Sequence, residues 1–103
     1  MAKVEIIWTD KATLSLFQIL DFYFNQNNDL KYGERLFEGI IKQTKLLIKQ
    51  PFLGKETDHF NIRELVIGRN SIFYLPIQSQ IIILLIWDNR QNPLVLFELL
   101  KEK

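Results

Sequence analysis

The stretch IIILLIWDNRQNP, from Ile81 to Pro93, places seven apolar residues directly before a cluster of an Asp, an Arg and three amides. The apolar part is far shorter than the roughly 20 residues that a membrane-crossing helix needs. A short run rich in β-branched residues and bounded by polar turn formers is typical of a strand that is covered on both faces. We therefore predict that residues 80–87 form a central strand and that the polar cluster lies where this strand leaves the core.

The first quarter of the chain predicts a strand followed by a helix. Residues 3–9 alternate loosely and are rich in β-branched and aromatic types, which favours a strand. From Lys11 to about Phe24 the apolar residues recur at helical spacing, which predicts a helix. Thr9 or Asp10 can cap this helix, because both side chains accept hydrogen bonds from the first turn.

A second amphipathic helix is the clearest element of the sequence. The polar run of residues 25–29 predicts a turn before it, with Asn28 or Asp29 as its cap. Pro51 and Gly54 end it, because Pro cannot continue a helix and Gly permits a tight turn. Its apolar stripe follows i, i+3, i+4, i+7 spacing and consists of Leu36, Phe37, Ile40, Ile41, Thr44, Leu47 and Ile48. The two helices predict an antiparallel hairpin that needs a sheet to cover.

Three apolar segments, residues 62–67, 71–77 and 80–87, follow the hairpin and are separated only by GRN and QS. Links this short predict an antiparallel meander. Pro76 donates no ladder hydrogen bond, so a bulge or a free edge is expected near it. The tail after Pro93, LVLFELLKEK, is compatible with either a helix or a strand. The predicted fold class is α+β: an N-terminal strand, a helical hairpin and a three-stranded antiparallel meander, with the helices packed on one face of the sheet.

Length and composition restrict the class of protein further. The 103 residues, 48% of them hydrophobic, predict a single domain over residues 1–103 with residues 94–103 as a C-terminal tail. The chain has no cysteine, which excludes disulfides, thiolate metal sites and thiol nucleophiles. Nucleotide-binding and zinc-ligand spacings are absent, so we expect no cofactor and no metal. The N-terminus lacks the apolar region of a signal peptide, which leads us to expect a cytoplasmic protein without a membrane partner.

Four segments together suggest a family: LIKQPFLGK at residues 47–55, IRELVI at 62–67, IFYLPI at 72–77, and the opening IIILLIWDNRQNP. In order and spacing, over about residues 3–95, they resemble the toxin subunits of RelE/ParE-type bacterial toxin–antitoxin pairs. The resemblance implies the fold derived above and a cytoplasmic growth inhibitor that a cognate antitoxin neutralises. Some members of this family cut messenger RNA on the ribosome, and others poison DNA gyrase without being nucleases.

A metal-free ribonuclease needs a group that activates the ribose 2′-hydroxyl, a proton donor and cations near the phosphate. If this chain were such an enzyme, the resemblance would assign these roles to Arg63, Arg90, Tyr74 and Lys55. Each of the four also has a structural interpretation. Tyr74 can be a core residue, and Lys55 a solvated loop residue.

The two arginines are the candidates with the most specific alternatives. We expect Arg63 on the concave side of the sheet, where it would bind a phosphate or an acidic antitoxin residue, or else form a salt bridge with Glu64 or Asp88. Arg90 lies two residues from Asp88, so that the two side chains can pair on one face, and the structural interpretation is favoured for it.

The sequence also weighs against a nuclease. RNA-cleaving family members typically carry a Tyr, or a His–Tyr pair, near the C-terminus, whereas no Tyr or His follows Arg90. The only histidine, His59, is interpreted as a surface residue. The net charge of +1 lacks the basic excess of tight nucleic-acid binders.

These observations make gyrase inhibition our favoured interpretation. The alternatives are a ribosome-dependent messenger endoribonuclease and a non-toxic descendant that retains only antitoxin binding. For a target interface we single out the exposed side of the hairpin, with Lys42, Lys45 and Lys49, and the tail from Pro93. An extended tail and an open edge of the last strand would together leave apolar surface for the antitoxin.

Overall fold

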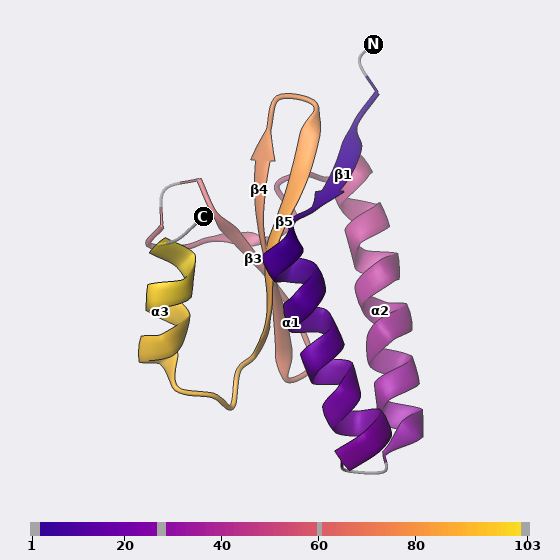
Figure 1. Cartoon of the computed structure of the whole chain (residues 1–103). Coiled ribbons are helices and arrows are strands. Elements are labelled where there is room, and N and C mark those ends of the chain that lie inside the picture. Colours follow the sequence, from indigo (N-terminus) through magenta and orange to yellow (C-terminus); the bar gives the residue numbers. More distant parts are fainter. Residues whose placement is uncertain (1–2, 27–28, 60, 102–103) are drawn as a thin grey trace.

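The structure is a computed structural model that describes residues 3–26, 29–59 and 61–101. It confirms the predicted α+β order, with a strand, a helical hairpin and an antiparallel meander (Figure 1). The tail, which the sequence left undecided, is a helix. The elements are β1 (Glu5–Trp8), α1 (Asp10–Asp21), the π-helical turn η1 (Phe22–Gln26), α2 (Leu30–Lys49), β2 (Lys55–Glu56), β3 (Arg63–Ile67), β4 (Asn70–Ile77), β5 (Gln80–Asp88) and α3 (Pro93–Lys101).

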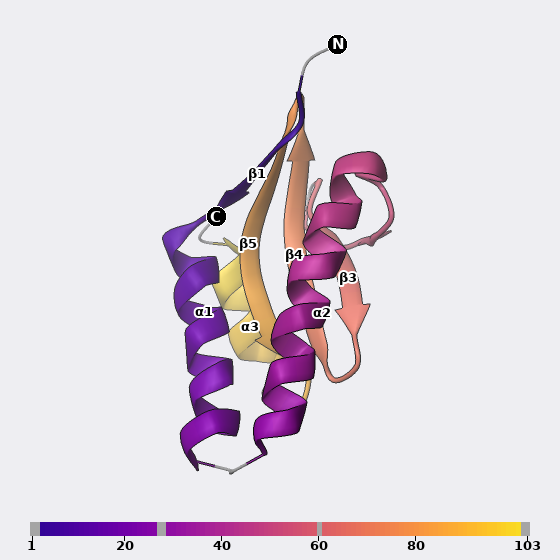
Figure 2. The same ribbon diagram turned by 90° about the vertical axis from the view of Figure 1, so that its right-hand side faces the viewer.

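The two long helices begin at the predicted kinds of caps and run antiparallel (Figure 2). Thr9, rather than Asp10, caps α1: its Oγ1 accepts a hydrogen bond from the backbone N–H of Ala12 at 3.0 Å. The side chain of Asp29 accepts the N–H of Tyr32 at 3.2 Å and caps α2, while the other candidate cap, Asn28, lies outside the described residues. A cap satisfies one of the backbone donors that the first turn leaves unpaired.

The sheet has the strand order β1-β5-β4-β3-β2. The neighbours β3, β4 and β5 are antiparallel, and β1 lies parallel to β5. The strand predicted to be central, β5, is indeed flanked by β1 and β4. The short strand β2 was not predicted, because two exposed residues carry no hydrophobic pattern.

The strand β5 has no neighbouring strand along part of one edge, and α1 covers that part. β1 pairs with residues Gln80–Ile83 of β5 and no further. Beyond this point the N–H of Ile86 donates to Oγ of Ser15 at 3.0 Å, so that a helix side chain replaces a strand. The open edge considered for an antitoxin strand is therefore occupied by α1.

Pro76 lies at a free edge, as predicted. The β3–β4 register ends at the pair Arg63 and Tyr74, so Pro76 has no β3 neighbour that would need its missing N–H. A register shift between β4 and β5 also falls at Phe73 and Tyr74, two residues earlier. The chain therefore accommodates this proline without losing a ladder hydrogen bond.

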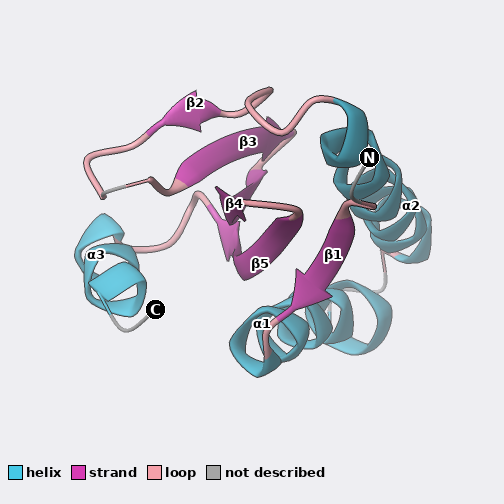
Figure 3. Cartoon of the chain, turned by 90° about the horizontal axis from the view of Figure 1, so that it is seen from above, coloured by secondary structure: helices cyan, strands magenta, loops and turns pink. Residues whose placement is uncertain are grey.

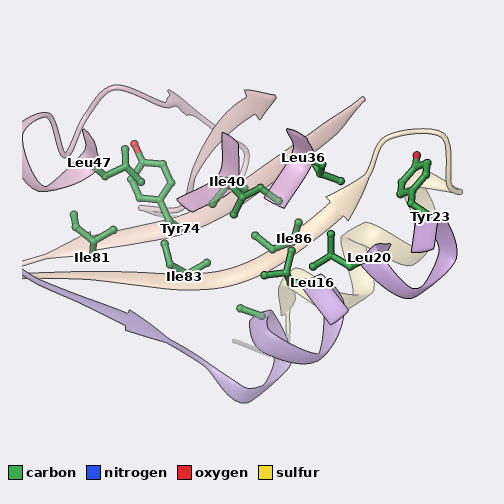
Figure 4. Packing of buried hydrophobic residues seen from close by; sticks show 12 residues of the cluster. Leu16, Leu20, Tyr23, Leu36, Ile40, Leu47, Tyr74, Ile81, Ile83 and Ile86 are labelled. Atoms are coloured by element: carbon green, nitrogen blue, oxygen red, sulfur yellow. The ribbon is translucent and has the colours of Figure 1, made fainter. Parts of the chain in front are cut away.

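The sheet separates two apolar layers (Figure 3). The helical hairpin packs on one face, where Leu16, Leu20, Leu36, Ile40 and Leu47 meet Ile83, Ile86 and Tyr74 (Figure 4). The helix α3 packs on the other face, where Leu96, Leu99 and Leu100 contact a cluster that includes Phe73, Leu85 and Trp87. Because β5 is covered on both faces, its sequence is an unbroken apolar run rather than an alternating one.

None of the helices in the described ranges is long and apolar enough to span a membrane.

Candidate functional site

Tyr74 is a fully buried residue that stabilises the loop after α2. Its hydroxyl donates to the carbonyl of Pro51 at 2.9 Å and accepts the N–H of Gly54 at 2.8 Å. Burial raises the pKa of Tyr74 above its ordinary value, so the phenol stays protonated at neutral pH. Both hydrogen-bonding functions of the hydroxyl are used inside the protein.

Gly54 is the residue that allows this loop to approach Tyr74 so closely. A Cβ atom at position 54 would lie 2.8 Å from the Tyr74 hydroxyl and 2.9 Å from the carbonyl oxygen of Glu64. The Pro-x-x-Gly motif at Pro51 therefore has a structural cause: proline ends α2, and glycine leaves room for the phenol.

Arg63 lies opposite Tyr74 in the sheet and ends at the same loop. Its Nη1 donates to the carbonyls of Gly54, at 2.7 Å, and Phe52, at 3.3 Å. Its ion-pair partner is Glu56, at 3.5 Å, so the prediction of Glu64 or Asp88 as the partner was wrong. The alternation of β3 places Arg63 on the hairpin face of the sheet, with Leu65 and Ile67.

Lys55 lies in β2 and is largely exposed, with its Nζ 3.9 Å from Oε1 of Glu64. Glu64 in turn accepts a hydrogen bond from Oγ of the buried Ser71 at 2.6 Å, and Nδ2 of Asn89 donates to the same Oγ at 2.8 Å. This polar chain lies on the face of the sheet opposite Arg63. Nothing in the sequence signalled it, because its members are brought together only by the strand register.

Arg90 forms the predicted ion pair with Asp88. Its Nε and Nη2 donate to the two carboxylate oxygens at 3.0 and 2.7 Å, and its backbone N–H adds a third bond at 2.9 Å. Nη2 also donates to the hydroxyl of Tyr23 at 2.9 Å. The hydrogen bond from Arg90 holds the pKa of Asp88 below its ordinary value. The guanidinium is nevertheless half exposed, so it is fixed in place and open to solvent at once.

The four candidate catalytic residues do not converge on one place. Asp88, beside Arg90, pairs with Asn70, whereas Arg63 pairs with Tyr74, four residues along β4. At about 3.3 Å per residue this separates Arg90 from the other arginine by roughly 13 Å along the strand. Lys55 is on the opposite face of the sheet from Arg63. Their assignment as catalytic residues therefore stays a prediction, because the four side chains do not surround one common site.

His59 lies in the loop after β2, next to α3. The His59 ring is partly buried and lies 5.1 Å from the ring of Phe97, where it joins the loop after β2 to α3. Among the residues that the structure describes, no three His, Asp or Glu side chains gather in a way that could hold a metal ion.

Comparison with known proteins identifies the family. The family described as "ParE toxin of type II toxin-antitoxin system, parDE" matches residues 6–93. The chain belongs to the ParE toxin family. This match covers the hairpin, the DNRQNP segment and all of the sheet except Glu5, and it confirms the resemblance to RelE/ParE toxins.

A solved structure gives the same fold for this ParE-family chain. The structure titled "Chromosomal ParDE TA system from P. aeruginosa" has a TM-score of 0.68 and 23% sequence identity, and the alignment covers 81% of this chain and 92% of the other. At this identity the likeness establishes the fold. The search of curated proteins returned no match.

Proposed function

We propose that this chain is a toxin that stops growth by binding and inhibiting DNA gyrase, and that a cognate antitoxin neutralises it in the cytoplasm. Membership of the ParE family supports the toxin assignment. The observation that favours gyrase over messenger RNA is that the nuclease candidates are dispersed and engaged in structural bonds.

The chemistry of RNA cleavage explains why this observation supports the proposal. A general acid must come within hydrogen-bond reach of the leaving oxygen, about 2.6–3.2 Å. Tyr74 has no exposed surface, and its hydroxyl already has a donor and an acceptor. Arg63 is largely buried and bonds two loop carbonyls. A nuclease built on these residues would have to unfold the loop after α2 before each turnover.

The outer side of α2 is the surface that we propose for the gyrase contact. Phe37 and Ile48, which the sequence assigned to the core stripe, are instead exposed. The exposed Lys42, Lys45 and Lys49 lie beside them. An apolar strip rimmed by cations is typical of a protein interface rather than of a solvated helix.

Two parallel assays test the proposal: supercoiling by purified gyrase, and cleavage of messenger RNA on ribosomes. We expect the chain to block supercoiling and to leave the message intact. The double variant Lys45→Glu, Ile48→Ser should weaken inhibition by at least tenfold. Lys31→Glu is the matched control. Lys31 lies on the same helix, about 21 Å along the axis from Lys45, so this variant should inhibit like wild type.

The other outcomes assign the chain to the alternative classes. Cleaved message with unaffected gyrase would establish a ribosome-dependent endoribonuclease. Normal growth of cells that express the chain without antitoxin, with both assays negative, would establish a non-toxic descendant.

A further inference from the structure

Two arginines reach the same end of the molecule from different parts of the chain. The turn between β3 and β4, which carries Arg69, lies at the same end as the start of α2 and the end of β5 (Figure 2). The backbone N–H of Asn89 donates to the carbonyl of Arg69 at 2.8 Å, so the backbone of Arg69 lies next to the residue that precedes Arg90. The strand register therefore brings together two arginines that are distant in the sequence.

Arg90 is held in place while part of its guanidinium group is left unbonded. Its Nε and Nη2 donate to the carboxylate of Asp88, and Nη2 also donates to the hydroxyl of Tyr23 at 2.9 Å. Within the described part of the chain, its Nη1 makes no hydrogen bond. The side chain is 47% exposed, so the two N–H groups of Nη1 are left for a ligand.

Arg69 is placed by an aromatic ring rather than by a carboxylate. Its Cζ atom lies 5.0 Å from the centroid of the Tyr32 ring, which in turn lies 4.6 Å from the ring of Tyr23. The residue is exposed, and among the residues that the structure describes its guanidinium group has neither a hydrogen bond nor an ion pair. Exposed cation–π contacts are weak, so this side chain can turn toward Arg90 at little cost. Its five N–H donors are then open to a ligand.

The charges at this end of the molecule favour an anion. Burial raises the pKa of Tyr23, the charges of Arg90 and Arg69 oppose this shift, and the charge of Asp88 adds to it. Two cations thus act on the same buried phenol, and Asp88 offsets one of them. A carboxylate has one plane of acceptors, which one guanidinium group fills, whereas a tetrahedral phosphate presents acceptors to two. The complement of the two arginines is therefore a phosphate group.

We propose that Arg69 and Arg90 form a binding site for a phosphate monoester, such as the terminal phosphate of a nucleotide, or for free inorganic phosphate. Nη1 of Arg90 donates to one side of the phosphate, and Arg69 turns away from Tyr32 to bond the other side. The lysines of the proposed gyrase contact lie further along α2, so this site is separate from that surface. A nucleic-acid backbone fits less well, because each of its phosphates carries a single charge and two arginines contact only one of them.

The test is a titration of the purified chain with AMP and, separately, with inorganic phosphate. Binding is followed by the NMR shifts of the backbone N–H groups of residues 69–70 and 89–90, at an ionic strength held constant with sodium chloride. We expect saturable binding that Arg69→Gln weakens by at least tenfold. Lys49→Gln is the matched control, because it removes the same charge about 26 Å along α2 from Tyr32, and it should bind within twofold of wild type. Tighter binding of AMP would identify a nucleotide as the source of the phosphate, and equal binding would identify free phosphate.

The exposed Arg69 keeps the test valid even if Arg90→Gln, which also leaves Asp88 unpaired, fails to fold. Arg69→Lys retains the charge but loses the planar fork, so it should recover only part of the affinity. Wild-type affinity in Arg69→Gln would overturn the proposal. So would acetate that competes as well as phosphate does, because the site would then accept any anion. Tighter binding of a DNA oligonucleotide that lacks a terminal phosphate would also overturn it, and would assign the two arginines to nucleic acid.

Discussion

Tyr74 is the residue for which a catalytic and a structural role predict different outcomes. Tyr74→Phe keeps the ring but leaves the buried N–H of Gly54 and the carbonyl of Pro51 without partners. We expect the free energy of unfolding to fall by about 1–3 kcal/mol, with growth inhibition retained while the variant stays folded. Urea denaturation measures the first effect. Tyr32→Phe is the control, because its hydroxyl lies 3.5 Å from Asn70 and should matter less. Unchanged stability with lost toxicity would instead assign Tyr74 to chemistry.

Asp88 gives a prediction for the dependence of stability on pH. Its pKa is lowered in the folded chain by the hydrogen bond from Arg90, relative to an ordinary value of 3.8. On acidification the unfolded chain therefore takes up this proton first, and the stabilisation is present above about pH 4 and lost as the pH falls through the folded pKa. Asp88→Asn should be less stable than wild type at pH 7, and the difference should shrink below pH 4. Urea unfolding between pH 7 and 2.5 checks this, and a difference that stays constant over that range would contradict it.

At the scale of elements, Gly39 in the middle of α2 and Gly54 in the loop before β2 should respond to alanine in opposite directions. A Cβ at Gly54 would contact the Tyr74 hydroxyl and a backbone carbonyl at under 3.0 Å, whereas a Cβ at Gly39 would meet only Ile67, at 3.7 Å. Gly54→Ala should therefore lower the free energy of unfolding by about 1–3 kcal/mol through overpacking. Gly39→Ala lies inside α2 and should raise it by about 0.5–1 kcal/mol. Thermal unfolding of both variants measures the effects. A stabilised Gly54→Ala would show that the loop does not pack tightly against the Tyr74 hydroxyl.

Some of the elements could be predicted from the sequence, and others could not. The strand β5 was predictable because burial on both faces leaves an apolar run, and the caps Thr9 and Asp29 because few residue types accept the N–H groups of a first turn. The helix α3 could not be chosen over a strand, since its exposed side also carries the apolar residues Leu94, Val95 and Phe97. The partner of Arg63 was missed because sequence proximity favours Glu64, whereas the short strand β2 brings Glu56 beside it.

At the scale of the whole molecule, the sheet separates the helical hairpin from the helix α3. The outer side of α2 faces away from the sheet on the hairpin side, and a groove between α1 and α3 lies beside the end of β5.

The balance of charge over the whole molecule gives a last prediction. Thirteen Lys and Arg against twelve Asp and Glu leave a net charge of +1, and the basic side chains of β3 and the DNRQNP segment are already paired with Glu56 and Asp88. A single-stranded RNA of 20 nucleotides should therefore bind no more tightly than non-specific complexes do, with a Kd of roughly 10⁻⁶ M or weaker at physiological salt. Fluorescence anisotropy at several salt concentrations measures this. As a control, Glu34→Lys with Glu38→Lys adds basic charge to exposed positions of α2 and should tighten binding and steepen its salt dependence. Submicromolar binding by the wild-type chain, with a steep loss of affinity as salt rises, would favour messenger RNA over gyrase as the target.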